Sequence, residues 1–195
     1  MKKIVFALLL FLALVSCGNK SGSDDPVQAS LKAFLFEKYP DFENISFDAI
    51  KAVDTAYFND ELIRREKLFA LRMTQDDALY KKFVQEGKQK NAQLRYDNLL
   101  QDIRIKNGLD SIRASMGDSV NDIAFIIFQF SGSAVGGDKT TYFKETLAAL
   151  TPDNEVINIA PKLNELFKAT GRVIPGYRQL LKNEAGNAGD LGLAE

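Results

Sequence analysis

The 195-residue chain contains no histidine and no tryptophan, and it has a single cysteine, Cys17. Without histidine, neither Ser-His-Asp nor Cys-His catalysis can be assembled. The usual zinc centres are built from histidine and cysteine, so they are excluded as well. One cysteine cannot form a disulfide within the chain or a Cys-X-X-Cys redox motif. We therefore expect no metal ion and no cofactor.

A strong charge of either sign is also missing. The formal net charge is −1 at pH 7, with 25 basic and 26 acidic residues. Nucleic-acid-binding proteins need a basic patch or stripe, so we expect no nucleic-acid partner. An apolar fraction of 46% and 14 phenylalanines provide enough material for a packed core.

The long apolar run of the chain lies at its beginning. Ile4 to Val15 is apolar throughout and follows Lys2 and Lys3. A helix that crosses the hydrocarbon core of a bilayer needs about 20 residues, and this run is too short for that. A basic start, a short apolar segment and small residues before a cut are typical of a signal peptide. We predict a signal peptide over residues 1–16, and loss of its two lysines would lower the net charge to −3.

The sequence Leu14-Val15-Ser16-Cys17 closes this run and resembles the lipobox of bacterial lipoproteins at all four positions. The resemblance implies that the Cys17 thiol receives a diacylglycerol, that a peptidase cuts between Ser16 and Cys17, and that the new amino group is acylated. Each buried CH₂ contributes about 0.8 kcal/mol, so several acyl chains anchor a protein firmly. In this class Gly18 implies the outer membrane, while Asp24-Asp25 leave the periplasmic and the cell-surface face both open.

The segment after the cysteine is rich in glycine, serine, asparagine and aspartate. Residues 17–26 therefore predict a flexible tether, followed by a single α+β domain over residues 27–182. Apolar residues of Val27 to Tyr39 recur at helical spacing, and Pro40 ends that helix. Ile45 to Phe47 fits either a short strand or the lead into a helix over 48–53, because Phe47, Ile50 and Val53 are three apart.

Two long amphipathic segments predict a helical hairpin over about residues 59–116. Asn59-Asp60 offers an N-cap, Gly87 marks the turn, and Asn107-Gly108 could interrupt the second helix. An apolar stripe of this kind is usually core. The alternative is a groove that binds a partner.

From Asp122 the pattern changes to that of a β-meander over about residues 122–160. Ile123 to Phe130 has apolar residues at both odd and even positions, which is typical of a central strand that is covered on both faces. Ser131 to Thr140 is expected as a loop, 141–150 as a return strand or a helix, and 155–159 as a third strand. Helices are expected after Pro161 and from Pro175, and residues 183–195 as a disordered tail. The fold class is α+β, with a long helical hairpin, a small antiparallel β-meander and flanking helices.

This order of elements loosely resembles that of uncharacterised Bacteroidota-type lipoproteins. The residues that carry the resemblance are Leu35 to Phe47 and Phe125 to Ile159, with Gly136-Gly137 at the turn. The resemblance implies an N-terminal helix, a helical insertion and a closing β-meander. It implies no activity and no site residues.

One glycine-rich segment, Gly132 to Thr140, looks like a phosphate-binding loop. Such a loop needs Gly, four residues, Gly, and then Lys and Ser or Thr. Here Asp138 separates Gly137 from Lys139 and places a carboxylate where backbone amides should face phosphate. We interpret the segment as a β-turn in which glycine supplies a positive φ.

Paired carboxylates would allow glycoside hydrolysis without histidine. The candidates are Asp76, Asp77, Asp97, Asp102, Asp110 and Glu165. We expect all of them except Glu165 on exposed helix faces beside Lys and Arg, where they are solvated charges. Aromatic residues that could stack on sugars are Tyr57, Tyr80, Tyr96, Tyr142, Phe143 and Tyr177.

Together these patterns predict a lipid-anchored lipoprotein of the cell envelope that has no enzymatic activity. Its expected role is that of an accessory protein that binds an envelope protein partner. The alternative is a surface lipoprotein that binds a glycan or another small ligand.

Overall fold

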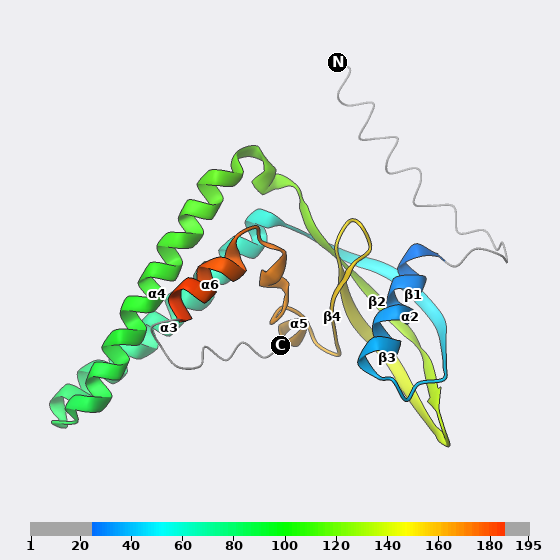
Figure 1. The fold of residues 1–195 in the computed structure, drawn as a ribbon, viewed down its shortest axis with the longest axis horizontal. Coiled ribbons are helices and arrows are strands. Elements are labelled where there is room, and N and C mark those ends of the chain that lie inside the picture. The colour runs from blue at the N-terminus through cyan, green and yellow to red at the C-terminus, as the bar shows by residue number, and fades with distance from the viewer. Residues whose placement is uncertain (1–24, 186–195) are drawn as a thin grey trace, which may run out of the picture.

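The computed structural model describes residues 25–185 and has mixed α+β architecture (Figure 1). The helices are α2 (Pro26–Lys38), α3 (Phe58–Gln85), α4 (Gln89–Met116), α5 (Leu163–Leu166) and α6 (Tyr177–Ala185), with 3₁₀ turns η1 (Gly117–Asn121) and η2 (Thr170–Val173). The strands are β1 (Asn44–Tyr57), β2 (Ile123–Gly136), β3 (Lys139–Leu150) and β4 (Val156–Ala160). The predicted fold class is confirmed, and the pair α3–α4 projects away from the sheet.

The four strands form one antiparallel sheet in the order β1-β2-β3-β4. The helix considered over residues 48–53 is wrong, because this segment is part of β1 and pairs with β2. The pairing register shifts between Phe47 and Ala49. An extra residue in a strand brings two positions that are three apart onto the same face. Phe47 and Ile50 accordingly pack in the same apolar cluster, so their helix-like spacing is that of a bulged strand.

The loop expected from Ser131 to Thr140 is also wrong, because β2 continues to Gly136 and β3 starts at Lys139. Gly132 permits this continuation, since a Cβ there would lie 2.2 Å from the carbonyl oxygen of Ser46 in β1. The turn itself is formed by Gly137, with φ +55°, and Asp138. The β-turn interpretation is confirmed for Gly137 only, because Gly132 and Gly136 belong to β2. The segment connects two strands, so it lacks the strand-to-helix context of a phosphate-binding loop.

The two faces of the sheet are covered by different segments. Helix α2 covers one face, where Leu31 contacts Phe130 and where Leu35 packs with Ile45. Asp25 caps this helix, since its side chain accepts a hydrogen bond from the backbone N–H of Val27 at 3.1 Å. On the opposite face, α5 and η2 lie near the end of the sheet at which β1 continues into α3, which we call the base of the sheet (Figure 1). The cluster there contains Ala56, Ala124, Phe125, Ile127, Ala149, Ile157, Ala160 and Leu166.

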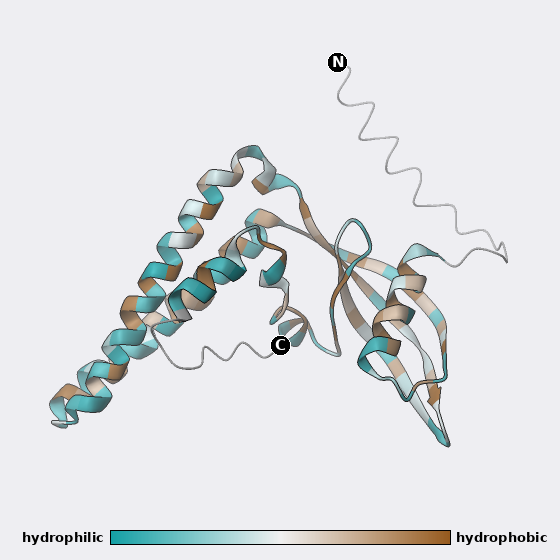
Figure 2. Ribbon diagram, in the orientation of Figure 1, coloured by the Kyte–Doolittle hydropathy of each residue, from teal (hydrophilic) through white to brown (hydrophobic). Residues whose placement is uncertain are grey.

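The predicted hairpin of α3 and α4 is confirmed, with its turn at Gly87 (φ +69°). The interruption considered at Asn107-Gly108 does not occur, since α4 continues through both residues. Gly108 is instead the position against which Leu180 of α6 packs. The missing side chain allows the two helices to approach closely. Figure 2 shows apolar residues interspersed with polar ones along α3, α4 and α6. The core that these helices share consists of Leu62, Phe69, Ile105, Leu109, Ile174, Tyr177 and Leu181.

The ends of the predicted domain need one adjustment. Asn183 and Glu184 belong to α6, so the tail predicted from residue 183 begins too early. Pro26, assigned to the tether, is the first residue of α2. The predicted signal peptide, residues 17–24 of the predicted tether and residues 186–195 of the predicted tail lie outside the described residues. Within residues 25–185, no helix combines the length and the apolarity needed to cross a membrane.

Candidate functional site

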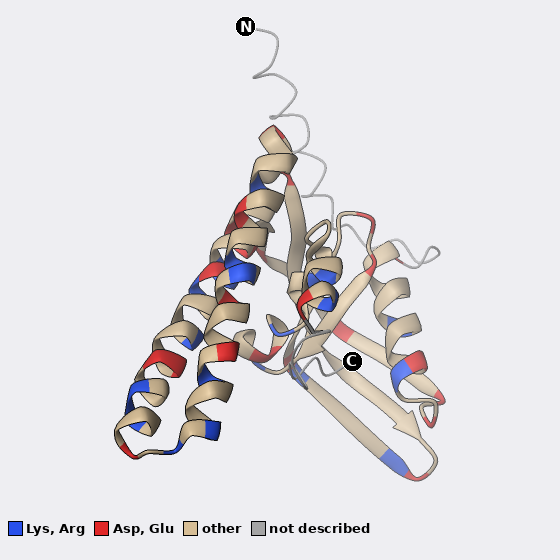
Figure 3. Cartoon of the chain, turned by 60° about the vertical axis from the view of Figure 1, so that its left-hand side comes forward, with Lys and Arg blue, Asp and Glu red and all other residues tan. Residues whose placement is uncertain are grey.

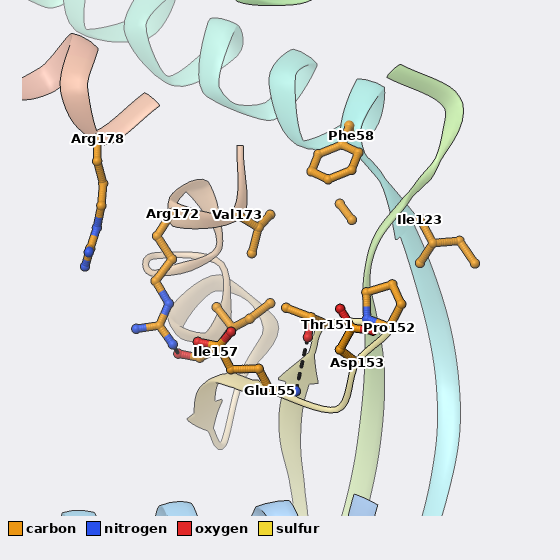
Figure 4. Close-up of a pocket in the computed structure, with 11 residues that line it drawn as sticks. Phe58, Ile123, Thr151, Pro152, Asp153, Glu155, Ile157, Arg172, Val173 and Arg178 are labelled. Atoms are coloured by element: carbon orange, nitrogen blue, oxygen red, sulfur yellow. Dashed lines mark hydrogen bonds between the residues drawn. The ribbon is translucent and has the colours of Figure 1, made fainter. Parts of the chain in front are cut away.

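A cavity of about 520 Å³ lies where the base of the sheet meets the C-terminal segment (Figure 4). Its apolar surface comes from Phe58 at the start of α3, Ala124 of β2, Ile157 of β4 and Val173 of η2. Small-molecule pockets in proteins typically measure about 300–1,000 Å³, so the cavity has the size of a binding site. Four segments that are far apart in the sequence converge on it, namely the start of α3, the start of β2, the β3–β4 turn with β4, and the C-terminal segment.

Four charged side chains line the same cavity. Arg172 and Arg178 come from the C-terminal segment, whereas Asp153 and Glu155 come from the turn between β3 and β4 (Figure 4). None of the four forms an ion pair with another described residue. The cavity therefore combines an apolar surface with two positive and two negative groups that do not neutralise each other by contact.

Hydrogen bonds hold the polar walls of the cavity in place. Nη2 of Arg172 donates to the carbonyl oxygens of Val156, at 3.0 Å, and Ile157. In the turn, the backbone N–H of Thr151 donates to the carbonyl oxygen of Glu155 at 2.9 Å, and the N–H of Glu155 donates back to Oγ1 of Thr151 at 3.1 Å. A site whose walls are fixed before binding loses less entropy when a ligand arrives.

Next to the cavity, a buried polar network ties α3 to the C-terminal segment. Arg65 donates to Oε1 of Glu61 from Nε at 2.8 Å and from Nη2 at 2.6 Å. The same Nη2 reaches the carbonyl oxygen of Phe167 at 2.6 Å, and Thr170 donates to Glu61 at 2.8 Å. Burial raises the pKa of the nearby Tyr177 phenol, an effect that the charge of Arg65 opposes. The network is saturated by its own members, which indicates a structural role.

A second buried charge cluster lies between α3 and α4. Asp102 is completely buried, and its Oδ1 lies 3.1 Å from Nη2 of Arg72, yet neither of its oxygens accepts a hydrogen bond from a described residue. Asp76 is also buried and accepts a hydrogen bond from Arg95 at 2.9 Å. Burial raises the pKa of Asp102 to about 6, although Arg72 acts in the opposite direction.

The carboxylates considered for glycoside hydrolysis differ in their exposure and do not form one site. Asp97 and Asp110 are exposed as expected, whereas the expectation of exposure is wrong for Asp76 and Asp102. These two are buried because both helices contribute an arginine to the interface, and each carboxylate lies against one of them. Glu165 lies elsewhere, in α5, with an intermediate exposure. No group of three or more acidic residues suited to a metal ion occurs within residues 25–185.

The aromatic candidates are not gathered on one surface. Tyr142 is 71% exposed near the tip of the β2–β3 hairpin, whereas its neighbour Phe143 packs against Phe130 on the α2 side of the sheet. Tyr80 and Tyr96 contact each other near the turn of the helical hairpin, with 5.7 Å between ring centres. Tyr177 is buried. The sequence identified the residue types but could not group them in space.

The helical hairpin itself is only half covered. Leu94, Gln101 and Gly108 of α4 are spaced by seven residues and share a face of the helix. Helix α6 covers two of them, because Leu180 packs on Gly108 and the side-chain amide of Gln101 donates to the carbonyl oxygen of Glu184 at 2.8 Å. Toward Gly87 the helix pair extends beyond the end of α6 (Figure 1), and Leu94 is 55% exposed there.

The lipidation and cleavage residues predicted from the sequence, Cys17 and Ser16, lie outside the described residues. The cavity was not identified from the sequence, since its charged residues come from a turn, η2 and α6, and no motif links them. No family model, curated protein or solved structure shows significant similarity to this chain.

Proposed function

We propose that this protein is a lipid-anchored lipoprotein of the bacterial outer membrane whose helical hairpin binds a helix of another envelope protein. The protein acts as a non-enzymatic accessory subunit. Its lipid is carried by Cys17, and the residues that follow connect the anchor to the domain. The lipobox Leu14-Val15-Ser16-Cys17 supports the anchor, and Gly18 supports the outer membrane.

The observation that carries the binding role is the exposure of Leu94. Gln101 and Gly108 lie one and two heptads further along the same face of α4, and α6 covers both of them. This face of α4 therefore accommodates a third helix. Near the hairpin turn the described chain supplies no such helix. A leucine that is exposed at a position equivalent to covered ones marks a binding surface for a helix with an apolar stripe.

The charge pattern of the hairpin supports binding of a protein rather than of a membrane surface. Figure 3 shows Lys and Arg interspersed with Asp and Glu along α3 and α4. Several of these side chains pair with each other, including Lys81 with Asp77 at 2.6 Å and Arg113 with Glu66. A helix that lies on an anionic membrane would instead present a basic face.

The experiment is site-specific photocrosslinking in intact cells. A photoreactive amino acid at position 94 of the full lipidated chain is expected to give one crosslinked product of defined mass. The matched control is position 71, where Leu71 is 56% exposed on α3. It directly precedes Arg72, which faces α4, and so lies about 100° further around α3.

We expect the crosslinked product from position 94 to disappear when Cys17→Ala removes the anchor. In affinity capture without a crosslinker, Leu94→Glu is expected to lose the same partner. If position 94 gives no product, or if both positions give the same products, the face of α4 that carries Leu94 is not the specific binding surface. Capture that persists in the Cys17→Ala protein would show that the partner does not depend on the membrane.

The alternative, a glycan-binding lipoprotein, has weaker support. Sugar-binding surfaces use aromatic rings that are grouped and exposed. Tyr142 is highly exposed but forms no ring contact with another described aromatic residue. The cavity at the base of the sheet is the better candidate for a small ligand.

A further inference from the structure

The cavity between the β3–β4 turn and the C-terminal segment has a composition that selects its ligand. Its apolar surface consists of Phe58, Ala124, Ile157 and Val173, and it has an open side. Burial of an apolar group there removes its surface from water, at about 25 cal/mol per Å². The cavity is therefore suited to a ligand that has an apolar part.

The charged groups define the remainder of the ligand. On the side of the C-terminal segment, Arg178 makes no hydrogen bond or ion pair with a described residue, and Arg172 uses only Nη2, leaving the N–H groups of Nε and Nη1 free. On the side of the turn, the carboxylates of Asp153 and Glu155 accept no hydrogen bond from a described residue. Guanidinium groups bind carboxylates, and the acidic pair binds an ammonium group.

Other classes of ligand fit the four charges less well. A nucleotide or another phosphate compound would bring its negative charge near Asp153 and Glu155. A polyamine would meet Arg172 and Arg178. A purely apolar ligand would leave all four groups without a partner. A molecule that carries one charge of each sign can satisfy both walls.

We propose that this cavity binds short apolar peptides with free ends. The peptide carboxylate lies against Arg172 and Arg178, its ammonium group lies near Asp153 and Glu155, and an apolar side chain contacts Ile157 and Val173. This inference is independent of the proposed docking of a helix at Leu94, which lies on the helical hairpin and not in the cavity.

Calorimetric titration of the purified full-length chain in mild detergent tests the proposal. The probes are leucine, Leu-Leu and Leu-Leu-Leu, with N-acetyl-Leu-Leu and Leu-Leu-amide as analogues that each lack one charge. We expect saturable binding of at least one of the free peptides and about tenfold weaker binding of both analogues, because each analogue loses a charge-assisted hydrogen bond.

Two variants separate the two walls. Arg178→Gln is expected to weaken the binding of Leu-Leu about tenfold. The affinity for Leu-Leu-amide should not change, because this analogue has no carboxylate that could contact Arg178. Asp153→Asn is expected to weaken the binding of Leu-Leu. The affinity for N-acetyl-Leu-Leu should not change, because this analogue has no ammonium group. The matched control is Lys182→Gln, which removes an exposed positive charge from the same helix, one turn beyond Arg178.

The proposal is overturned if none of the three free probes binds saturably, or if the blocked analogues bind as tightly as Leu-Leu. It is also overturned if Lys182→Gln weakens binding as much as Arg178→Gln, since the effect would then reflect overall charge. The three side chains that are changed, those of Arg178, Asp153 and Lys182, are exposed, and circular dichroism verifies that each variant remains folded.

Discussion

Nη2 of Arg72 in α3 lies 3.1 Å from Oδ1 of Asp102 in α4, although the carboxylate is completely buried and accepts no hydrogen bond from a described residue. Burial raises the pKa of Asp102 to about 6, and the neighbouring charge of Asp76 acts in the same direction. Arg72 opposes both effects. Asp76 is itself paired with Arg95 at 2.9 Å. The interface of the hairpin therefore contains a carboxylate that changes its charge near mildly acidic pH.

This relationship predicts a pH-dependent contribution to stability. The pKa of Asp102 is raised from 3.8 to about 6 on folding, so between these values the folded state holds more protons than the unfolded state. Stability contributed by this group is full below pH 3.8 and falls as the pH rises toward 6. Relative to the wild type, Asp102→Asn is expected to gain about 1–3 kcal/mol of unfolding free energy across that window.

The measurement is urea denaturation of both proteins at several pH values between 4 and 7. Asp110→Asn is the matched control, because Asp110 is exposed and pairs only with Lys106 at 3.6 Å. Its difference from the wild type is expected to stay within about 0.5 kcal/mol over this range. If the difference in unfolding free energy between Asp102→Asn and the wild type also stayed constant over this pH range, the raised pKa of Asp102 would be contradicted.

The Glu61–Arg65 pair predicts a large cost for removing one partner. Arg65→Leu removes the buried guanidinium that pairs with Oε1 of Glu61 and leaves only the half-buried Arg64, which pairs with Oε2, so we expect a loss of about 3 kcal/mol in unfolding free energy. The double variant with Glu61→Leu should recover part of the loss, since no unpaired charge stays buried. Arg104→Leu, which breaks a more exposed pair with Glu184, is expected to cost about 1 kcal/mol or less. Equal losses for Arg65→Leu and Arg104→Leu in denaturant titrations would refute the structural role of the network.

The close approach of β1 and β2 makes Gly132 sensitive to substitution. A Cβ at this position would lie 2.2 Å from the carbonyl oxygen of Ser46 and 2.9 Å from Cα of Phe47, and both are backbone atoms. We expect Gly132→Ala to lower the unfolding free energy by about 1–3 kcal/mol, because the strands must separate. Ser133→Ala, at the next residue, should change it by about 0.5 kcal/mol or less. Thermal unfolding of the two variants measures the difference, and matching melting temperatures would disprove the steric argument.

The proposed lipid anchor predicts a change of cellular fraction when Cys17 is replaced. Cys17→Ala removes the thiol that would carry the diacylglycerol, so the protein should move from the membrane fraction to the soluble fraction. Ser21→Ala, which leaves the lipobox intact, should stay in the membrane fraction. If the Cys17→Ala protein remains membrane-bound through a detergent-free wash, the interpretation of the lipobox is wrong. Protease treatment of intact cells then distinguishes the cell-surface from the periplasmic face.

Much of the fold could be predicted from local patterns. The two amphipathic segments, the turn at Gly87 and the apolar run of β2 are features of spacing and composition, and all three appear in the structure. The errors arose where pairing between distant segments decides the conformation. In β1 a bulge gives Phe47 and Ile50 a spacing of three that imitates a helix, and only the pairing with β2 shows that the segment is a strand.

The candidate sites were much less predictable. Asp76 and Asp102 stand beside charged residues in the sequence, which is the usual pattern of a solvated face, but the packing of α3 against α4 buries both. The cavity unites Phe58, Asp153, Arg172 and Arg178, which no sequence motif connects. The exposure of Leu94 is likewise a consequence of where α6 ends against α4.

The sequence by itself determined the absence of histidine chemistry and of a disulfide within the chain, the motif Leu14-Val15-Ser16-Cys17 on which the proposed anchor rests, and the helical hairpin, because these depend on residue type and on short-range periodicity. Only the tertiary structure decided which charges are buried and which groups surround one cavity. Burial and proximity arise from contacts between residues that are far apart in the chain. Arg65 and Thr170 illustrate this, since they meet at 3.1 Å only because the C-terminal segment folds back onto α3.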